Sequence, residues 1–210
     1  MSLRILTFLF ILLTAGPAMA GAQGTGYEAI AEGRLVYRNI KKLILFLFVT
    51  SIDEVVILFL ALVAGFGPPL LAIHVLWINL VTEGVLTINL IMDPPEGEEM
   101  KVRPVPLSEP LLDRALLSRI PLMVIASVAS VFGWFLFRTY QGVSHELVRT
   151  ETFTALAVSQ WWNVLNCRST THSVLSREIF SNHWLILGLI AANLLQLAVV
   201  YLPFMNEFFH

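Results

Sequence analysis

Five apolar stretches constrain this chain more than any other feature, because each is close to the length that crosses a lipid bilayer. A membrane-spanning helix needs about 20 mostly apolar residues. The stretches are Leu43–Ala64, Leu70–Ile91, Ile120–Phe137, Phe153–Leu165 (the weakest) and Trp184–Leu202. Hydrophobic residues make up 57% of the chain and charged residues 13%, against about 45–50% and about 25% in soluble domains. The sequence therefore predicts an all-α, polytopic transmembrane helix bundle of about five spans.

The N-terminal segment differs from these spans. Arg4 precedes a short apolar run, Ile5–Thr14, which is followed by Ala18-Met19-Ala20. A short apolar core followed by an Ala-x-Ala site is typical of a secretory signal peptide, and an uncleaved anchor helix is the alternative. We therefore divide the chain into a signal-like or anchor segment with its linker, residues 1–26, and a transmembrane region, residues 27–210.

Basic residues lie at alternate ends of the predicted spans. They precede the first span and separate the second from the third and the fourth from the fifth: Arg34, Arg38, Lys41, Lys42, Lys101, Arg103, Arg114, Arg119, Arg168 and Arg177. The turns at the other end contain only Arg138 and Arg149. Because basic residues mark the cytoplasmic side, these segments are predicted to be cytoplasmic, in a bacterial inner (plasma) membrane. An exported N-terminus would place the first cluster outside, so both N-terminal alternatives stay open.

Charge and cysteine content exclude several classes of protein. The net charge is −2, which gives no basic surface for nucleic acid. The single cysteine, Cys167, excludes an intrachain disulfide and a cysteine-rich metal site. No phosphate-binding loop, dinucleotide-binding motif or zinc-protease motif is present in the sequence. We expect the lipid bilayer as a partner, no nucleic acid, and no cofactor in this chain.

Two predicted spans carry carboxylates near their middle. Asp53 and Glu54 lie in the first span and Glu83 in the second. A charged side chain at the centre of a membrane helix costs roughly 2.5–3.5 kcal/mol and usually faces the bundle interior or water. The turn at residues 65–69 is short, so the two spans are antiparallel neighbours. Glu54 and Glu83 are therefore predicted to converge inside the bilayer, whereas the role of Asp53 stays open.

Neutral polar side chains accompany these glutamates. Ser51 shares a helix face with Glu54, and Asn79, Thr82 and Glu83 follow the i, i+3, i+4 spacing of one face. Carboxylate, amide and hydroxyl oxygens suit a hard cation such as Ca²⁺, Mg²⁺, Na⁺ or a hydrated proton. The alternative is that such side chains only join helices, but ionisable residues are expensive for that purpose.

Other polar residues extend this pattern. Asn89 returns to about the same face of the second span, and Gly84 permits either close helix approach or local unwinding. Gln160 and Asn163 form a similar i, i+3 pair in the fourth span, with Asn166 continuing the row. For this pair, hydrogen bonding between helices and cation ligation are equally open.

Several segments, in order, resemble the fifth to ninth membrane helices of P-type cation-transporting ATPases, most closely the calcium-pump-like class. Residues 32–42 resemble the join between the phosphorylation domain and the fifth helix, and Glu54-Val55-Val56 resembles the acidic motif of that helix. Residues 76–84, LWINLVTEG, resemble the sixth-helix motif. Residues 163–169 and 201–205 are similar to the ends of the eighth and ninth helices.

This resemblance implies which residues bind the transported cation. Glu54, Asn79, Thr82 and Glu83 match cation-coordinating positions, although Glu83 replaces the usual Asp. Ser51 stands where many members have Asn, and Gln160 where some have Glu. The uncharged Gln160 leaves one of two possible ion sites altered or absent.

The resemblance also implies a role and its alternatives. The 210 residues contain no DKTG phosphorylation motif and no nucleotide-binding or actuator domain. We therefore expect the ion-binding membrane region of a pump, which does not hydrolyse ATP by itself and has a separate chain with the catalytic half as a possible partner. The alternatives are a nonfunctional truncated remnant and a small ATP-independent cation channel or carrier.

Overall fold

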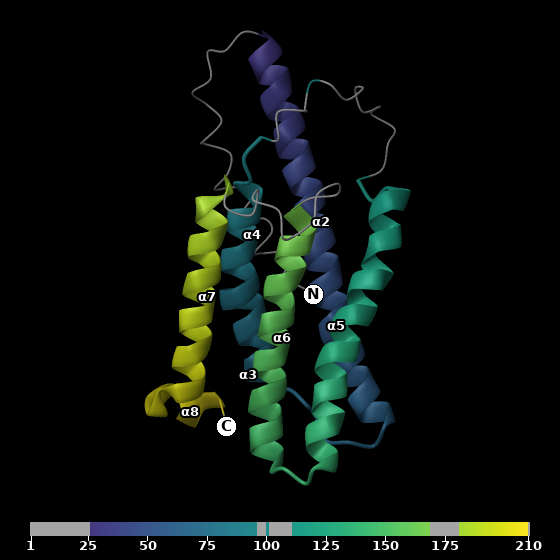
Figure 1. Cartoon of the computed structure of the whole chain (residues 1–210), viewed down its shortest axis with the longest axis vertical. Helices are drawn as coiled ribbons and strands as arrows, with labels where there is room; N and C mark the ends of the chain where they lie inside the picture. The colour runs from purple at the N-terminus through teal and green to yellow at the C-terminus, as the bar shows by residue number, and fades with distance from the viewer. Residues whose placement is uncertain (1–25, 96–99, 101–110, 169–180, 210) are drawn as a thin grey trace.

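The regular structure of the chain is helical throughout the residues that the computed structural model describes, 26–95, 100, 111–168 and 181–209 (Figure 1). A π-helical segment, η2, joins α3 to α4, and these three form one continuous rod. The elements are α2 (Gly26–Val63), α3 (Ala72–Trp77), η2 (Ile78–Thr82), α4 (Glu83–Ile91), α5 (Arg114–Tyr140), α6 (His145–Arg168), α7 (His183–Tyr201) and α8 (Pro203–Phe209). The predicted signal-like segment lies outside the described residues.

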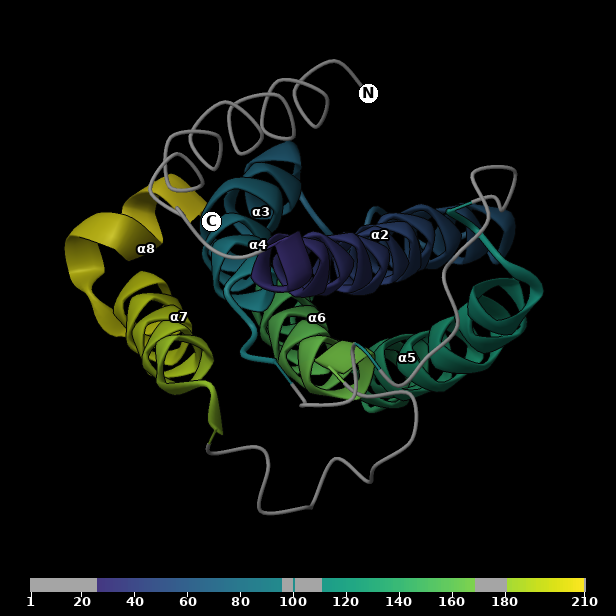
Figure 2. The same cartoon turned by 90° about the horizontal axis from the view of Figure 1, so that it is seen from above.

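Each predicted span coincides with part of this helical bundle. Among the described residues, α2, the α3–α4 rod, α5 and α7 are long and apolar enough to cross a membrane. The weakest predicted span lies in α6, which is too polar to join that set. However, α6 packs against α2, α4, α5 and α7 in the middle of the bundle (Figure 2). These neighbours shield its polar groups from lipid, and the all-α polytopic bundle is confirmed.

Helix α2 is too long for the bilayer alone. Its 38 residues span about 57 Å at about 1.5 Å per residue, whereas the hydrocarbon core of a bilayer is about 30 Å thick. Its first buried side chain is Asn39, and it extends beyond the other helices at one end (Figure 1). The N-terminal part of α2, residues 26–38, therefore forms a stalk outside the apolar layer.

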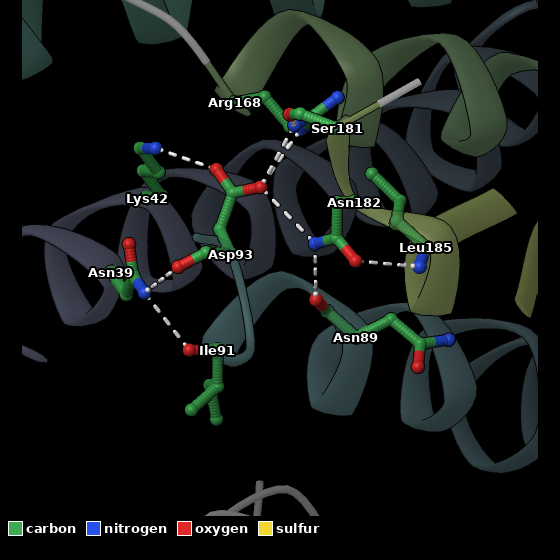
Figure 3. Close-up of polar contacts among 9 residues, drawn as sticks. All are labelled: Asn39, Lys42, Asn89, Ile91, Asp93, Arg168, Ser181, Asn182 and Leu185. Atoms are coloured by element: carbon green, nitrogen blue, oxygen red, sulfur yellow. Dashed lines mark hydrogen bonds and ion pairs between the residues drawn. The ribbon is translucent and has the colours of Figure 1, made fainter. Parts of the chain in front are cut away.

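A buried ion cluster joins three helix ends to the side of α2 at the base of this stalk (Figure 3). The carboxylate of Asp93, just after α4, accepts hydrogen bonds from Lys42 Nζ at 2.7 Å, Arg168 Nε at 3.0 Å and Asn182 Nδ2 at 3.1 Å. The Asn39 side chain donates to the Asp93 backbone carbonyl at 2.9 Å. One carboxylate thus connects α2, α4, α6 and the N-cap of α7, and fixes how these helices meet.

The bundle gathers basic residues at this same end. Its described members are Arg34, Arg38, Lys41, Lys42, Arg114, Arg119 and Arg168, whereas Lys101, Arg103 and Arg177 lie outside the described residues. The Arg119 guanidinium donates to the Asn166 carbonyl at 2.9 Å, which places the start of α5 beside the end of α6. Arg138 and Arg149 lie toward the α5–α6 turn at the opposite end. This asymmetry supports a cytoplasmic stalk.

The orientation predicts a pattern of thiol labelling in intact cells. A membrane-impermeant thiol reagent added outside should label Ser144→Cys, in the exposed α5–α6 turn, but not Glu32→Cys, on the exposed stalk. After the cells are opened, both variants should react. The native Cys167 is buried, so the unmodified chain gives the background. Labelling of Glu32→Cys alone in intact cells would invert the orientation and favour an exported N-terminus.

Asn89 of α4 faces α7. A Cβ atom on Gly188 of α7 would collide with the Asn89 side-chain amide and press on Val85. By contrast, a Cβ atom on Gly84 would meet nothing within 4 Å. Close helix approach is therefore wrong for Gly84, and the tight contact of this rod lies at Gly188.

These two glycines form a matched pair for mutation. Gly84→Ala and Gly188→Ala gain the same helix propensity, about 1 kcal/mol, so the difference between them isolates the contact. We expect the free energy of unfolding of Gly188→Ala to be lower than that of Gly84→Ala by about 1–3 kcal/mol, the usual cost of overpacking. Equilibrium unfolding in detergent micelles measures both. Equal stabilities would show that Asn89 moves aside without cost.

Candidate cation site between α2, η2, α4 and α6

The second predicted span changes its helical period at the centre of the site. Residues Ile78–Thr82 form a π-helix, and the Glu83 N–H donates to the Ile78 carbonyl, five residues earlier. Single π-turns inside α-helices are rare and frequently lie at functional sites. The sequence alternative of local unwinding near Gly84 is thus realised as a wide turn just before it. The spacing assumed for Asn79, Thr82 and Glu83, that of a regular α-helix, is correspondingly wrong.

The wide turn presents Asn79 to α2. The Asn79 Nδ2 atom donates to both carboxylate oxygens of Glu54 at 3.0 Å, and to the Val75 carbonyl at 2.7 Å. Glu54 is only 3% exposed, so its carboxylate faces the bundle interior. The other arm of the amide, Asn79 Oδ1, is buried and has no hydrogen-bond partner in the described structure. A carboxylate and an unsatisfied amide oxygen therefore adjoin each other.

A second glutamate–amide pair lies between α4 and α6. The Gln160 Nε2 atom donates to Glu83 Oε1 at 3.3 Å, and both side chains are buried. Gln160 Oε1 also has no hydrogen-bond partner in the described structure. Thr82, beside Glu83, is buried at 2% exposure. The π-turn thus leaves Asn79 in contact with α2 and Glu83 in contact with α6.

Ser51 lies one turn before Glu54 and is half-buried. Its hydroxyl donates to the Leu47 carbonyl at 2.5 Å, which is a bond within its own helix. The hydroxyl proton is therefore committed to the backbone, while the oxygen retains a lone pair. Ser51 remains a predicted ligand whose described contact is local.

The donor set of this site is rich in oxygen. Within the described residues, no three His, Cys, Asp or Glu side chains gather in a metal-binding arrangement. A cation here would therefore combine the glutamates with neutral oxygens. Asn79 Oδ1 and Gln160 Oε1 are suitable, because both are buried and neither has a partner. Oxygen-only sets of this kind bind hard cations.

Sequence reasoning missed part of the polar interior. Asp53 is fully buried and accepts a hydrogen bond from Asn163 Nδ2 at 3.2 Å. The same nitrogen donates to Ser127 Oγ of α5 at 2.8 Å. Hydrogen bonding between helices, one of the two alternatives for Asn163, is thus observed. The only sequence signal for Ser127 is a hydroxyl that, with Ser130, interrupts an apolar span, and such hydroxyls are too common in membrane helices to predict a contact.

Comparison with known proteins also identifies cation-transporting ATPases as relatives of this chain. The family described as "Cation transporting ATPase, C-terminus" matches residues 67–210. The calcium-transporting ATPase of Bacillus subtilis (strain 168) is 34% identical over 184 residues, which are 87% of this chain and 21% of that protein. The probable cation-transporting ATPase F of Mycobacterium tuberculosis (strain ATCC 25618 / H37Rv) is 33% identical over 181 residues, 86% of this chain and 20% of that protein.

A mammalian relative shows the same partial coverage. The calcium-transporting ATPase type 2C member 2 of Mus musculus is 29% identical over 187 residues, 87% of this chain and 19% of that protein. The chain thus spans about a fifth of the length of the curated relatives it matches.

Proposed function

Because this chain belongs to the cation-transporting ATPase family and matches its C-terminal region, we propose that its buried glutamates bind the transported cation inside the membrane. The chain is an integral membrane protein, the membrane region of a P-type cation ATPase. The proposed ligands are the oxygens of Glu54, Glu83, Asn79, Thr82, Gln160 and Ser51.

The observation that carries this proposal is the pairing of each glutamate with an unsatisfied amide oxygen. Asn79 and Gln160 each direct an NH₂ group at a carboxylate and leave the oxygen without a partner. Amide nitrogen and oxygen are nearly equal in size, so rotating the amide by about 180° brings its oxygen toward the carboxylate. That arrangement is repulsive unless a cation lies between the two oxygens. The pairs can therefore alternate between hydrogen bonding and cation ligation.

Charge and ligand type favour a divalent cation. Glu54 and Glu83 together carry two negative charges, which match one Ca²⁺, and Ca²⁺ accepts carboxylate, amide and hydroxyl oxygens in flexible geometry. The names of the relatives from Bacillus subtilis and mouse support Ca²⁺ as the cargo. The proton is one alternative, and Mg²⁺ and Na⁺ are the alternatives that the experiment below compares with Ca²⁺.

The wider setting is also a proposal. A catalytic half, on the same polypeptide or on a separate chain, would supply phosphorylation, and the α2 stalk is the segment placed to meet it. The bacterial relatives, at 33–34% identity, support a bacterial plasma membrane as the location.

A joined pump tests this function. Residues 27–210 would replace the matching region of the Bacillus subtilis relative, and ATP hydrolysis would be measured in membrane vesicles with Ca²⁺, Mg²⁺ or Na⁺ as the varied cation. We expect Ca²⁺ to stimulate hydrolysis, because the proposal requires a cation in the membrane site before the catalytic half hydrolyses ATP. Absence of stimulation by all three cations, with the parent relative active in parallel, would contradict the proposal. Cation flux without ATP would instead indicate a channel or carrier.

A further inference from the structure

A third carboxylate adjoins the proposed cation site but faces different helices. Asp53 is fully buried, and its contacts are with the Ser127 hydroxyl of α5 and the Asn163 amide of α6. Within the described part of the chain, no Lys or Arg side chain contacts it, and the charged group that interacts with it is Glu54. Asp53 Oδ1 is buried without a hydrogen-bond partner. Buried charges are normally paired or coordinate a metal ion, so Asp53 lacks a positive counterpart.

Two other carboxylates of the bundle, those of Asp93 and Glu151, differ from Asp53 because each has a basic partner. Asp93 contacts Lys42 and Arg168 at one end of the bundle. Glu151 accepts from Arg138 at 2.7 Å toward the other end. In both cases a basic side chain supplies the counter-charge. The environment of Asp53 supplies no basic group, so its carboxyl is neutralised either by a proton or by a cation from outside the chain.

Oxygen atoms surround Asp53 on the side of α5 and α6. Ser159 Oγ donates to Ser127 Oγ at 2.8 Å, and Asn163 Nδ2 donates to the same oxygen at 2.8 Å. A hydroxyl carries one proton and two lone pairs, so Ser127 gives its own proton to Asp53. The hydroxyl groups rotate freely and the amide carries its own oxygen, so all three side chains are able to offer lone pairs to a cation.

These oxygens border a large cavity between α5, α6 and α7. Its volume is about 1050 Å³, and Ser127, Ser159 and Asn163 line one part of it. Glu151 and Tyr201 line the part that lies toward the α5–α6 turn. Polar and ionisable groups inside a membrane usually face protein or a water-filled cavity. The other residues that line this cavity are mostly apolar, and it extends from that end of the bundle to Ser127 and Asn163, the contacts of Asp53.

We propose that Asp53, Ser127, Asn163 and Ser159 form a second cation site, separate from the glutamate site and reached through the α5–α6–α7 cavity. The single charge of Asp53 matches a monovalent hard cation, and Na⁺ is the ion that its oxygen ligands suit. Water in the cavity completes the coordination, because hard cations accept water among their ligands. The site lies between α2, α5 and α6, whereas the glutamate site lies between α2, η2, α4 and α6.

Equilibrium binding of radioactive Na⁺ to the full chain in lipid vesicles tests this proposal, with N-methylglucamine maintaining ionic strength. We expect saturable binding that Asp53→Asn abolishes and that Ser127→Ala weakens by roughly 10-fold or more, the cost of losing a group that supports a metal site. Ser130→Ala is the matched control, because Ser130 lines the same cavity but donates to the Ala126 carbonyl of its own helix. Unchanged binding in Asp53→Asn, or equal losses in the two serine variants, would overturn the assignment.

Two further measurements make the test independent of the glutamate site and of folding. Glu83→Gln should lose Ca²⁺ binding and keep Na⁺ binding, so the two proposals fail separately. Ser159→Cys should react with an impermeant thiol reagent supplied from the α5–α6 turn side, and Na⁺ should slow that reaction. No reaction from that side would show that the cavity is closed to water, and no effect of Na⁺ would show that the cation binds elsewhere; either result contradicts the proposal.

Discussion

Asp93→Ala is expected to lower the free energy of unfolding by about 3–5 kcal/mol, the usual cost of removing one partner from a buried ion pair. The substitution removes the carboxylate that Lys42 and Arg168 share, at side-chain exposures of 6% and 10%. It also removes the acceptor for Asn182, the N-cap of α7. Because four helices meet at this carboxylate (Figure 3), the loss should destabilise the whole bundle. Equilibrium unfolding in detergent micelles measures the change.

A similar pair nearer the surface provides the control. Asp113 caps α5 through the Leu116 N–H and contacts Lys41 at 2.8 Å, with 27% of its side chain exposed. Asp113→Ala should therefore cost about 0.5–2 kcal/mol, the value of an N-cap, since exposed ion pairs add little. Replacing Asp93, Lys42 and Arg168 together with apolar residues should recover stability, as in other buried clusters. If Asp93→Ala costs no more than Asp113→Ala, the cluster does not stabilise the bundle.

Glu54→Gln and Glu83→Gln are expected to abolish cation-dependent phosphorylation in the joined pump. Each substitution removes a negative charge from a site built for a hard divalent cation and keeps the shape of the side chain. Changes to groups that only support metal ligands cost about 10–100-fold in affinity, so loss of a direct carboxylate ligand should exceed this range. Phosphorylation from ATP, measured against Ca²⁺ concentration, reports the shift.

Glu151→Gln is the matched control for these variants. It makes the same chemical change within α6, but Glu151 is paired with Arg138 and is 23% exposed. We expect its Ca²⁺ dependence to match that of the unsubstituted pump. Equal losses in all three variants would indicate that removing any carboxylate damages folding, and would remove the support for a specific site.

The sequence predicted the helices well because span length and apolar content are local properties. All five stretches coincide with helical segments to within about two residues at their ends, and the polar character of residues 153–165 already marked α6 as unusual. The stalk follows from the basic run before the first span. In contrast, the Asp93 cluster depends on contacts between residues 51 and 75 positions apart in the chain. Only the packing of whole helices brings such residues together, so one sequence indicates Asp93 merely as a helix end before two prolines.

The sequence predicted which residues form the candidate site but only part of their arrangement in space. Burial of Glu54 and Glu83 followed from the cost of charge in lipid. Their amide partners did not, because the π-turn at Ile78–Thr82 changes the direction of every side chain after it. Asp53 was left open because neighbours on one helix point about 100° apart, and its partners lie on helices far along the chain.

Equilibrium Ca²⁺ binding to the joined pump tests the central claim most directly, because it detects ligation without requiring catalysis. The claim is that Glu54 and Glu83, with the oxygens of Asn79 and Gln160, bind the transported cation. We predict saturable Ca²⁺ binding in the unsubstituted pump, its loss in Glu54→Gln and in Glu83→Gln, and its retention in Glu151→Gln. Ca²⁺ binding that persists undiminished in both glutamate variants would contradict this account.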